Sequence, residues 1–310
     1  MSMTNSNHKT LSRRHFFGAM AGAAAAPAVL TMAGAARAAE AASGASGEAD
    51  PYKVGGFYLG VQAWTFRNFS AQEAIEMTAR AGGRVIEFFP GQRFAPEGEG
   101  NWGHDAGEDE RKVIKDKLAE FDIKPMNYGV VGVPNDEAGA RKIFEFAKEF
   151  DMIGITTESV NALDVMEKLA EEYDLKVCIH NHPERPNDPD YRVWNPEYVM
   201  EYVKDRHPNL GACADTGHWI RSGLDPMECL EALKGRVYST HFKDRLDPNG
   251  PDQIFGVGQA TLVRQLQWML DQGFEGNVSI EYETNWDASL PDVAQCVGYV
   301  RGIGEVKGWS

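Results

Sequence analysis

The chain has 310 residues with 31 basic and 46 acidic side chains, a formal net charge of −15. This length fits one large α/β domain or two smaller ones. The acidic balance argues against nucleic acids and anionic membranes as partners, because binding to phosphates needs clustered lysine and arginine. The four cysteines have no CxxC or zinc-finger spacing, so we expect buried free thiols, with one disulfide as the alternative in an exported protein. They are Cys178, Cys213, Cys229 and Cys296.

The first 38 residues have the organisation of a twin-arginine secretory signal. Ser12-Arg13-Arg14-His15-Phe16-Phe17 precedes an alanine-rich run from Gly18 to Ala36, and Ala36-Arg37-Ala38 is a small-x-small cleavage site. The alternative, an N-terminal membrane anchor, is disfavoured because the run is short and weakly apolar beside the ~20 strongly apolar residues of a spanning helix. We therefore expect export to the periplasm in a folded state, with the metal inserted beforehand. No other segment is long and apolar enough to cross a bilayer, so no membrane contact is expected after cleavage.

Residues 39–52 are rich in Ala, Gly, Ser and Glu and are predicted to be a flexible linker. The remainder, residues 53–310, suits a single (β/α)₈ barrel of the usual ~250 residues. Removing the signal leaves 27 basic against 46 acidic residues, a mature charge of −19.

Short apolar runs alternate with amphipathic stretches along the mature chain. The pattern predicts strands at 59–64, 84–89, 125–130, 154–158, 176–180, 210–215, 237–242 and 278–282. It predicts a helix from about residue 70, where Ser70 and Glu73 form a capping box, and others at 108–121, 136–150, 163–173, 197–203, 226–234, 261–271 and 291–303.

Eight alternating strand–helix pairs indicate an α/β fold with a parallel sheet, and we expect a single-domain TIM barrel. A doubly wound open sheet is the competing fold, but no Gly-x-Gly-x-x-Gly follows the first strand. The long segments 90–107 and 183–195 are predicted to be loops that shape specificity.

Five side chains of the metal-binding type end the last five predicted strands. They are Glu158, His180, Asp215, His241 and Glu281. In a barrel these strand ends meet at the face where active sites form. Singly, each would more often be structural, but burying five unpaired would cost several kcal/mol. Two imidazoles with two or three carboxylates suit one Mn²⁺, Co²⁺, Zn²⁺ or Fe²⁺ ion, and Mg²⁺ less well.

Four motifs at these strand ends carry a family resemblance. They are Cys178-Ile179-His180-Asn181-His182-Pro183, Ala214-Asp215-Thr216-Gly217-His218-Trp219, Thr240-His241-Phe242-Lys243-Asp244 and Ser279-Ile280-Glu281-Tyr282-Glu283. From about Leu59 onward the chain resembles the xylose isomerase-like TIM-barrel superfamily, in particular the proteins called sugar phosphate isomerases/epimerases.

The resemblance implies a metal held by Glu, Asp, His and Glu from the last four strands, as in the ketose epimerases of the superfamily. Asp215, His241 and Glu281 match the last three of these ligands. His180 stands where those epimerases have the first Glu, which together with the final Glu forms their acid/base pair. Glu158, one strand earlier, is then a candidate for a fifth ligand or for the base.

The chemistry expected is abstraction of a proton next to a carbonyl, with the enediolate stabilised by the metal. The candidate acid/base groups are Glu158, His182, His218 and, from the resemblance, Glu281. Further side chains are predicted to contact a sugar or its enediolate: Trp64, His218, Trp219, Arg221 and Lys243.

Two outcomes follow from an enediolate. Reprotonation makes the protein a sugar isomerase or epimerase, the leading prediction, whereas loss of a β-substituent makes it a lyase that cleaves 3-keto-glycosides. Without turnover it would be a periplasmic sugar-binding or metal-storage protein. A nuclease of the same fold needs three metals and a basic DNA face, which the acidic charge disfavours.

Overall fold

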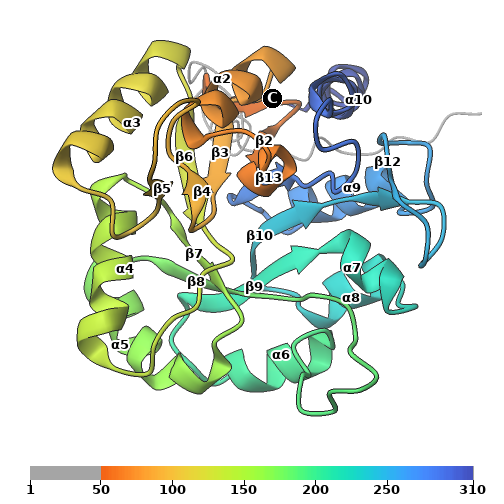
Figure 1. The fold of residues 1–310 in the computed structure, drawn as a ribbon. Helices are drawn as coiled ribbons and strands as arrows, with labels where there is room; N and C mark the ends of the chain where they lie inside the picture. The colour runs from red at the N-terminus through yellow and green to blue at the C-terminus, as the bar shows by residue number, and fades with distance from the viewer. Residues whose placement is uncertain (1–49, 310) are drawn as a thin grey trace, which may run out of the picture. The chain divides into compact units, whose positions relative to one another are not determined.

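The computed structural model describes residues 50–309, so the predicted signal and most of the predicted linker lie outside the described residues. Eight parallel strands form a closed barrel, because β2 pairs with β3 on one side and with β13 on the other (Figure 1). This confirms the predicted TIM barrel. The strands are β2 (Phe57–Gln62), β3 (Val85–Phe88), β6 (Lys124–Tyr128), β7 (Gly154–Thr157), β8 (Lys176–His180), β9 (Leu210–Asp215), β10 (Val237–Phe242) and β13 (Asn277–Ile280).

Helices surround the barrel, and the first of them begins as predicted. The Ser70 Oγ accepts a hydrogen bond from the Glu73 amide at 3.2 Å, and the Glu73 carboxylate accepts one from the Ser70 amide at 2.8 Å. The helices are α2 (Ala71–Ala81), α3 (Glu108–Phe121), α4 (Glu137–Glu149), α5 (Leu163–Tyr173), α6 (Pro196–Val203), α7 (Thr216–Arg221), α8 (Pro226–Ala232), α9 (Leu262–Asp271) and α10 (Leu290–Lys307), with 3₁₀ turns η1 (Ala63–Phe66) and η2 (Val160–Ala162).

Several short elements were absent from the sequence prediction. Helix α7 follows β9 directly. Two small antiparallel ribbons lie in connections for which the sequence predicted no strand, β4 (Gln92–Arg93) with β5 (Asn101–Trp102) and β11 (Asp244–Arg245) with β12 (Asp252–Gln253). Strand β1 (Lys53–Val54) pairs antiparallel with β2 just after the predicted linker.

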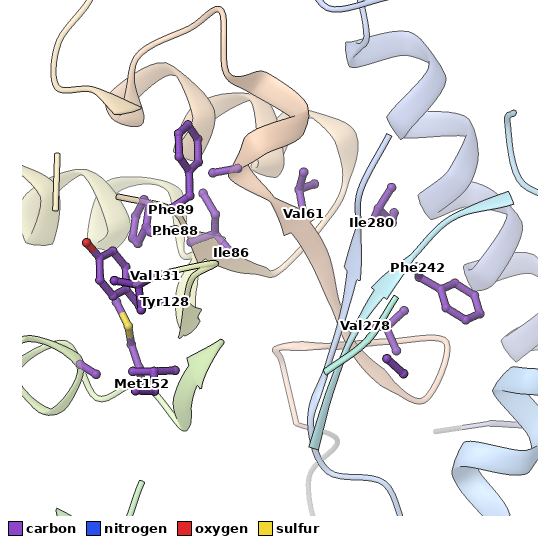
Figure 2. Close-up of a cluster of buried hydrophobic side chains, with 14 of the residues drawn as sticks. Val61, Ile86, Phe88, Phe89, Tyr128, Val131, Met152, Phe242, Val278 and Ile280 are labelled. Atoms are coloured by element: carbon purple, nitrogen blue, oxygen red, sulfur yellow. The ribbon is translucent and has the colours of Figure 1, made fainter. Parts of the chain in front are cut away.

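The apolar core lies between the barrel and its helices. On β3, Ile86 and Phe88 are fully buried, and Phe88 meets Trp102 edge to face at 5.6 Å between ring centroids. Trp102 in turn contacts Phe146 of α4. Figure 2 shows part of this apolar layer, including side chains of β2, β3, β6, β10 and β13.

The inside of the barrel is polar instead. Glu87, between Ile86 and Phe88 on β3, is fully buried and accepts hydrogen bonds from Thr156 at 2.7 Å, Asn277 at 3.0 Å and Ser279 at 3.1 Å. Successive residues of a strand point to opposite faces, so one strand serves both the apolar shell and the polar interior. The free energy of folding from apolar burial therefore comes mainly from the outer layer.

The four cysteines are all free and buried, which confirms the predicted thiols. Within residues 50–309, none of the helices combines the length and the apolar character that crossing a membrane requires.

Gly60 of β2 is paired with Val85 of β3 and has no room for a side chain. A Cβ at Gly60 would lie 1.6 Å from the Val85 carbonyl oxygen. Only a residue without a side chain fits there, because the oxygen belongs to backbone that is fixed by the sheet.

We therefore expect Gly60→Ala to lower the free energy of unfolding by about 3 kcal/mol or more, measured by urea denaturation. Gly302→Ala is the matched control. Gly302 is exposed in α10, and a methyl group added there would meet no neighbouring atom within 4 Å, so this change should be neutral or stabilising by ~0.5–1 kcal/mol. Equal stability of the two variants would contradict the packing argument.

Candidate metal centre

The carboxyl ends of four neighbouring strands bring together His180, Asp215, His241 and Glu281. A donor atom of each lies within 4.8 Å of the donor atoms of the others, and all four side chains are buried. The sheet register produces this arrangement, because His241 is paired with Asp215 across β9 and β10. All four are residues that the sequence predicted as ligands.

His180 has one ring nitrogen engaged and one without a partner. Its Nδ1 lies 3.1 Å from Glu158 Oε1 in a hydrogen bond, whereas its buried Nε2 has no hydrogen-bond partner and lies 3.5 Å from Asp215 Oδ2. Burial alone would lower the pKa of His180, but the nearby Asp215 carboxylate and the hydrogen bond with Glu158 outweigh it and raise this pKa above its ordinary value. A carboxylate on one nitrogen and a metal on the other is a common arrangement for a ligating histidine.

Glu158 accepts several hydrogen bonds on one oxygen. Its Oε1 receives the ring of His180, the His182 Nδ1 at 2.5 Å, the His182 amide at 3.2 Å and the Tyr191 hydroxyl at 2.9 Å. Burial would raise the pKa of Glu158, but the hydrogen bonds from His180 and His182 hold it far below its usual value. Glu158 groups with His180 and His182 and not with Asp215, His241 and Glu281. Its position is that of a residue that orients two imidazoles.

Asp215 divides its two carboxylate oxygens between two tasks. Oδ1 accepts the His218 amide at 2.7 Å and so caps the N-terminus of α7, while Oδ2 faces the cluster and lies 2.5 Å from Lys243 Nζ. Burial would raise the pKa of Asp215, but nearby His218 and Lys243 hold it well below its ordinary range.

His241 lies between two carboxylates. Nε2 is 3.1 Å from Glu87 Oε1, and Nδ1 is 3.1 Å from Glu281 Oε2, although neither contact has the geometry of a hydrogen bond. Burial alone would lower the pKa of His241, but Cys213, Glu87 and Glu281 raise it well above its ordinary value. Sequence reasoning missed Glu87. An acidic residue inside the apolar strand Val85–Phe88 was the available signal.

Lys243 lies among the carboxylates of the cluster. It is fully buried, and its ammonium contacts Asp215 Oδ2 and Glu281 Oε2 and lies 3.6 Å from Glu283 Oε2. In this structure the ammonium neutralises carboxylates of the ligand set, and its contact with substrate stays a prediction. Burial would lower the pKa of Lys243, but Asp215 and Glu281 raise it well above its ordinary value.

The cluster opens into a cavity of about 260 Å³. One side of this cavity is aromatic, where Trp64 and Phe89 meet edge to face at 5.0 Å, and the Trp64 Nε1 donates a hydrogen bond to Glu283 Oε1 at 3.2 Å. The lining residues are Gln62, Trp64, Phe89, Pro90, Val130, His180, His182, Glu281 and Glu283.

Besides Lys243, three other residues predicted to contact substrate do not line this cavity. Trp219 is buried in the apolar core, and Arg221 is exposed at the end of α7. Both residues belong to α7, whose turns direct successive side chains around the helix, so that only part of it faces the barrel. His218 lies behind His182, with ring centroids 5.1 Å apart, and its burial lowers its pKa well below the ordinary value.

A larger cavity of about 600 Å³ lies at the opposite end of the barrel. Its lining includes the residues where strands begin, such as Lys176 and Val237. No group of metal-binding residues occurs there in the part of the chain that the structure describes.

The four clustered residues fit a divalent metal ion. His180 Nε2 and both ring nitrogens of His241 are buried without a hydrogen-bond partner. Buried polar atoms are seldom left unpaired, and a metal ion would give such nitrogens a partner. Two imidazoles and two carboxylates suit transition-metal ions, though the residues alone do not identify the metal.

The chain matches known proteins over its barrel. A family model described as a xylose isomerase-like TIM barrel matches residues 154–297. A search of curated proteins found no match. Among solved structures, an uncharacterised protein from Parabacteroides distasonis is 30% identical, with a TM-score of 0.63, and the match covers 79% of this chain and 98% of that one.

Two more distant structures share the fold. A xylose isomerase-like TIM-barrel protein from Mycobacterium smegmatis, in complex with magnesium, is 14% identical with a TM-score of 0.62, covering 82% of this chain and 98% of that one. A D-psicose 3-epimerase from Clostridium cellulolyticum, with D-tagatose, is 13% identical with a TM-score of 0.60, covering 79% and 98%.

We expect the affinity for Mn²⁺ to rise with pH, chiefly above the ordinary histidine pKa of ~6.5, with about two protons released per metal bound. His180 and His241 hold their protons to higher pH than a free histidine, and each must be neutral to bind a metal. Calorimetric titration in buffers of different ionisation enthalpy measures the proton release. His104→Asn is the control, since His104 contacts Tyr128 outside the cluster. An affinity independent of pH would refute the two-histidine site.

Proposed function

Because the chain belongs to the xylose isomerase-like TIM-barrel family, we propose that it is a metal-dependent sugar isomerase or epimerase. The observation that carries this proposal is a single cavity in which a metal-binding cluster, an imidazole paired with a carboxylate and an aromatic wall meet. When bound at His180, Asp215, His241 and Glu281, a divalent ion would supply a Lewis acid for the oxygens of a carbonyl substrate.

The cavity suits a small polyhydroxylated substrate. Trp64 and Phe89 offer an apolar surface for the C–H face of a sugar, and the carboxylates of Glu281 and Glu283 lie on the charged side. Gln62 is held by a hydrogen bond of 2.6 Å from its Nε2 to the Gly129 carbonyl, so this wall is fixed in advance.

His182 is the proposed general base. Its Nδ1 lies 2.5 Å from Glu158 Oε1, which keeps the proton on Nδ1 and leaves Nε2 free to take a proton from carbon. Its side chain is 42% exposed, in contrast to the fully buried His180. His180 stands where the resemblance places the glutamate of related epimerases, and this pair supplies a proton acceptor two residues further along.

Glu281 and Glu283 approach the same cavity from the end of β13. Removal of a proton by His182, followed by delivery of a proton from solvent by way of the carboxylate side, inverts a carbon, which is epimerisation. A proton returned to the neighbouring carbon is isomerisation. Both reactions use the same residues, so the substrate's binding orientation decides between them.

The test is incubation of the metal-loaded protein with a panel of ketoses and with 3-keto-glucosides in D₂O. The proposal expects deuterium in the carbon next to the carbonyl and a new ketose or aldose in the product mixture. Release of the aglycone from a 3-keto-glucoside with free ketoses unchanged would replace the isomerase with a lyase. Binding without any turnover would leave a sugar-binding protein.

His182→Gln should lower the rate of deuterium incorporation by about 10²–10⁴-fold while leaving Mn²⁺ affinity nearly unchanged. Glu158→Gln should lower both, because Glu158 also orients His180, with a loss of about 10–100-fold in metal affinity. The rates are compared at saturating metal, and His104→Gln serves as the control outside the cavity. If His182→Gln retains full exchange, another group is the base.

We further propose that the protein acts outside the cytoplasm after twin-arginine export. The support is the sequence of residues 12–38. The substitution of Lys for both Arg13 and Arg14 should retain the protein in the cytoplasm, whereas Arg37→Lys, the same change outside the pair, should leave export intact. Cell fractionation with immunoblotting measures this, and periplasmic protein from the double variant would contradict the route.

A further inference from the structure

Lys243 has an environment that differs from that of every other described lysine. It is fully buried, and three carboxylates surround its ammonium: Asp215, Glu281 and Glu283. It is absent from the lining of the cavity, so a substrate there meets Glu281 and Glu283 before it meets the ammonium.

Three consecutive residues hold different parts of this lysine. Thr216 Oγ1 accepts the Lys243 amide at 2.9 Å and donates to the Lys243 carbonyl at 3.0 Å. Gly217 lies against the stem, since a Cβ there would be 2.5 Å from Lys243 Cβ and 2.7 Å from its Cδ. Asp215 contacts the ammonium. The Asp215-Thr216-Gly217 sequence therefore places the charge at one position.

That position matters because the ammonium contacts the oxygens that face the metal-binding cluster. Asp215 Oδ2 lies 3.5 Å from His180 Nε2, and Glu281 Oε2 lies 3.1 Å from His241 Nδ1. Those two histidines keep ring nitrogens without hydrogen-bond partners, so the ammonium satisfies the oxygens of the set and not its nitrogens.

We infer that Lys243 is a built-in counter-cation of the metal centre. In the metal-free protein it holds the Asp215 and Glu281 carboxylates together. The positive charge of Lys243 would repel a divalent ion at the cluster and weaken its binding, so the metal would be exchangeable. The inference rests on the proposed metal site and concerns how tightly that site binds.

The experiment compares the full chain with its Lys243→Met and Lys243→Gln variants, all purified with Mn²⁺ and then stripped with a chelator. Mn²⁺ and Zn²⁺ affinities are measured by competition with a chromophoric chelator, and melting temperatures are measured with and without metal. Lys176→Met is the matched control. Lys176 begins β8 at the opposite end of the barrel, where its ammonium donates to Asn209.

The neutral variants should bind Mn²⁺ at least ~10-fold more tightly than the wild type and melt at a lower temperature without metal, and the difference in melting should shrink at saturating metal. A variant that unfolds when stripped, while the wild type stays folded, supports the same role. Lys176→Met should leave the affinity unchanged.

Equal or weaker metal binding by the Lys243 variants, with unchanged melting of the stripped protein, overturns the inference and leaves the proposed function standing. If neither the wild type nor the variants bind metal, the metal site and the inference fail together. Metal binding by the variants alone would show that Lys243 takes the place of the ion in the natural chain.

Discussion

Charges buried in the barrel must be neutralised by one another, because burial removes most of their contact with water. Glu87, Asp215 and Glu281 are carboxylates with little or no exposure, and an unpaired buried charge is far more costly than a paired one. Neighbouring strands provide the cations and hydrogen-bond donors that these carboxylates contact. The positions of the imidazoles and of the ammonium follow from this need.

The same requirement gives the barrel its layers. Glu87 takes hydrogen bonds from β7 and β13, and its other neighbour is a ring nitrogen of His241. Glu87 thus contacts both the polar interior of the barrel and His241, a predicted metal ligand. The apolar shell outside, visible in Figure 2, supplies the burial that stabilises this polar interior. A chain with an apolar barrel interior would have no means of holding His241 from beneath.

Much of the fold was predictable because its signals are local. Helices α3 and α5 have the predicted bounds, and the capping box of Ser70 and Glu73 marks the start of α2. Helix α7 was missed because six residues are too few for an amphipathic period to be visible. In addition, the capping role of Asp215 was hidden behind its role as a candidate ligand.

The clustering of His180, Asp215, His241 and Glu281 was predictable from strand ends alone, since parallel strands finish on one face of a barrel. What each side chain contacts was not. Tyr191 reaches Glu158 from a loop without any local pattern, and the Lys243 ammonium contacts carboxylates from two other strand ends. Such partners are set by three-dimensional packing between distant segments, which the one-dimensional spacing of residues does not contain.

The two oxygens of Asp215 place position 215 under two separate demands. An asparagine there would still start α7 with its side-chain oxygen, yet would leave Lys243 and the imidazoles facing a neutral amide. A glutamate would keep the charge, but its longer side chain would move the oxygen away from the His218 amide. The start of a helix and the charge of the cluster thus depend on the same few atoms. Substitution of Asp215 during evolution is therefore costly even in a descendant that no longer uses the cavity.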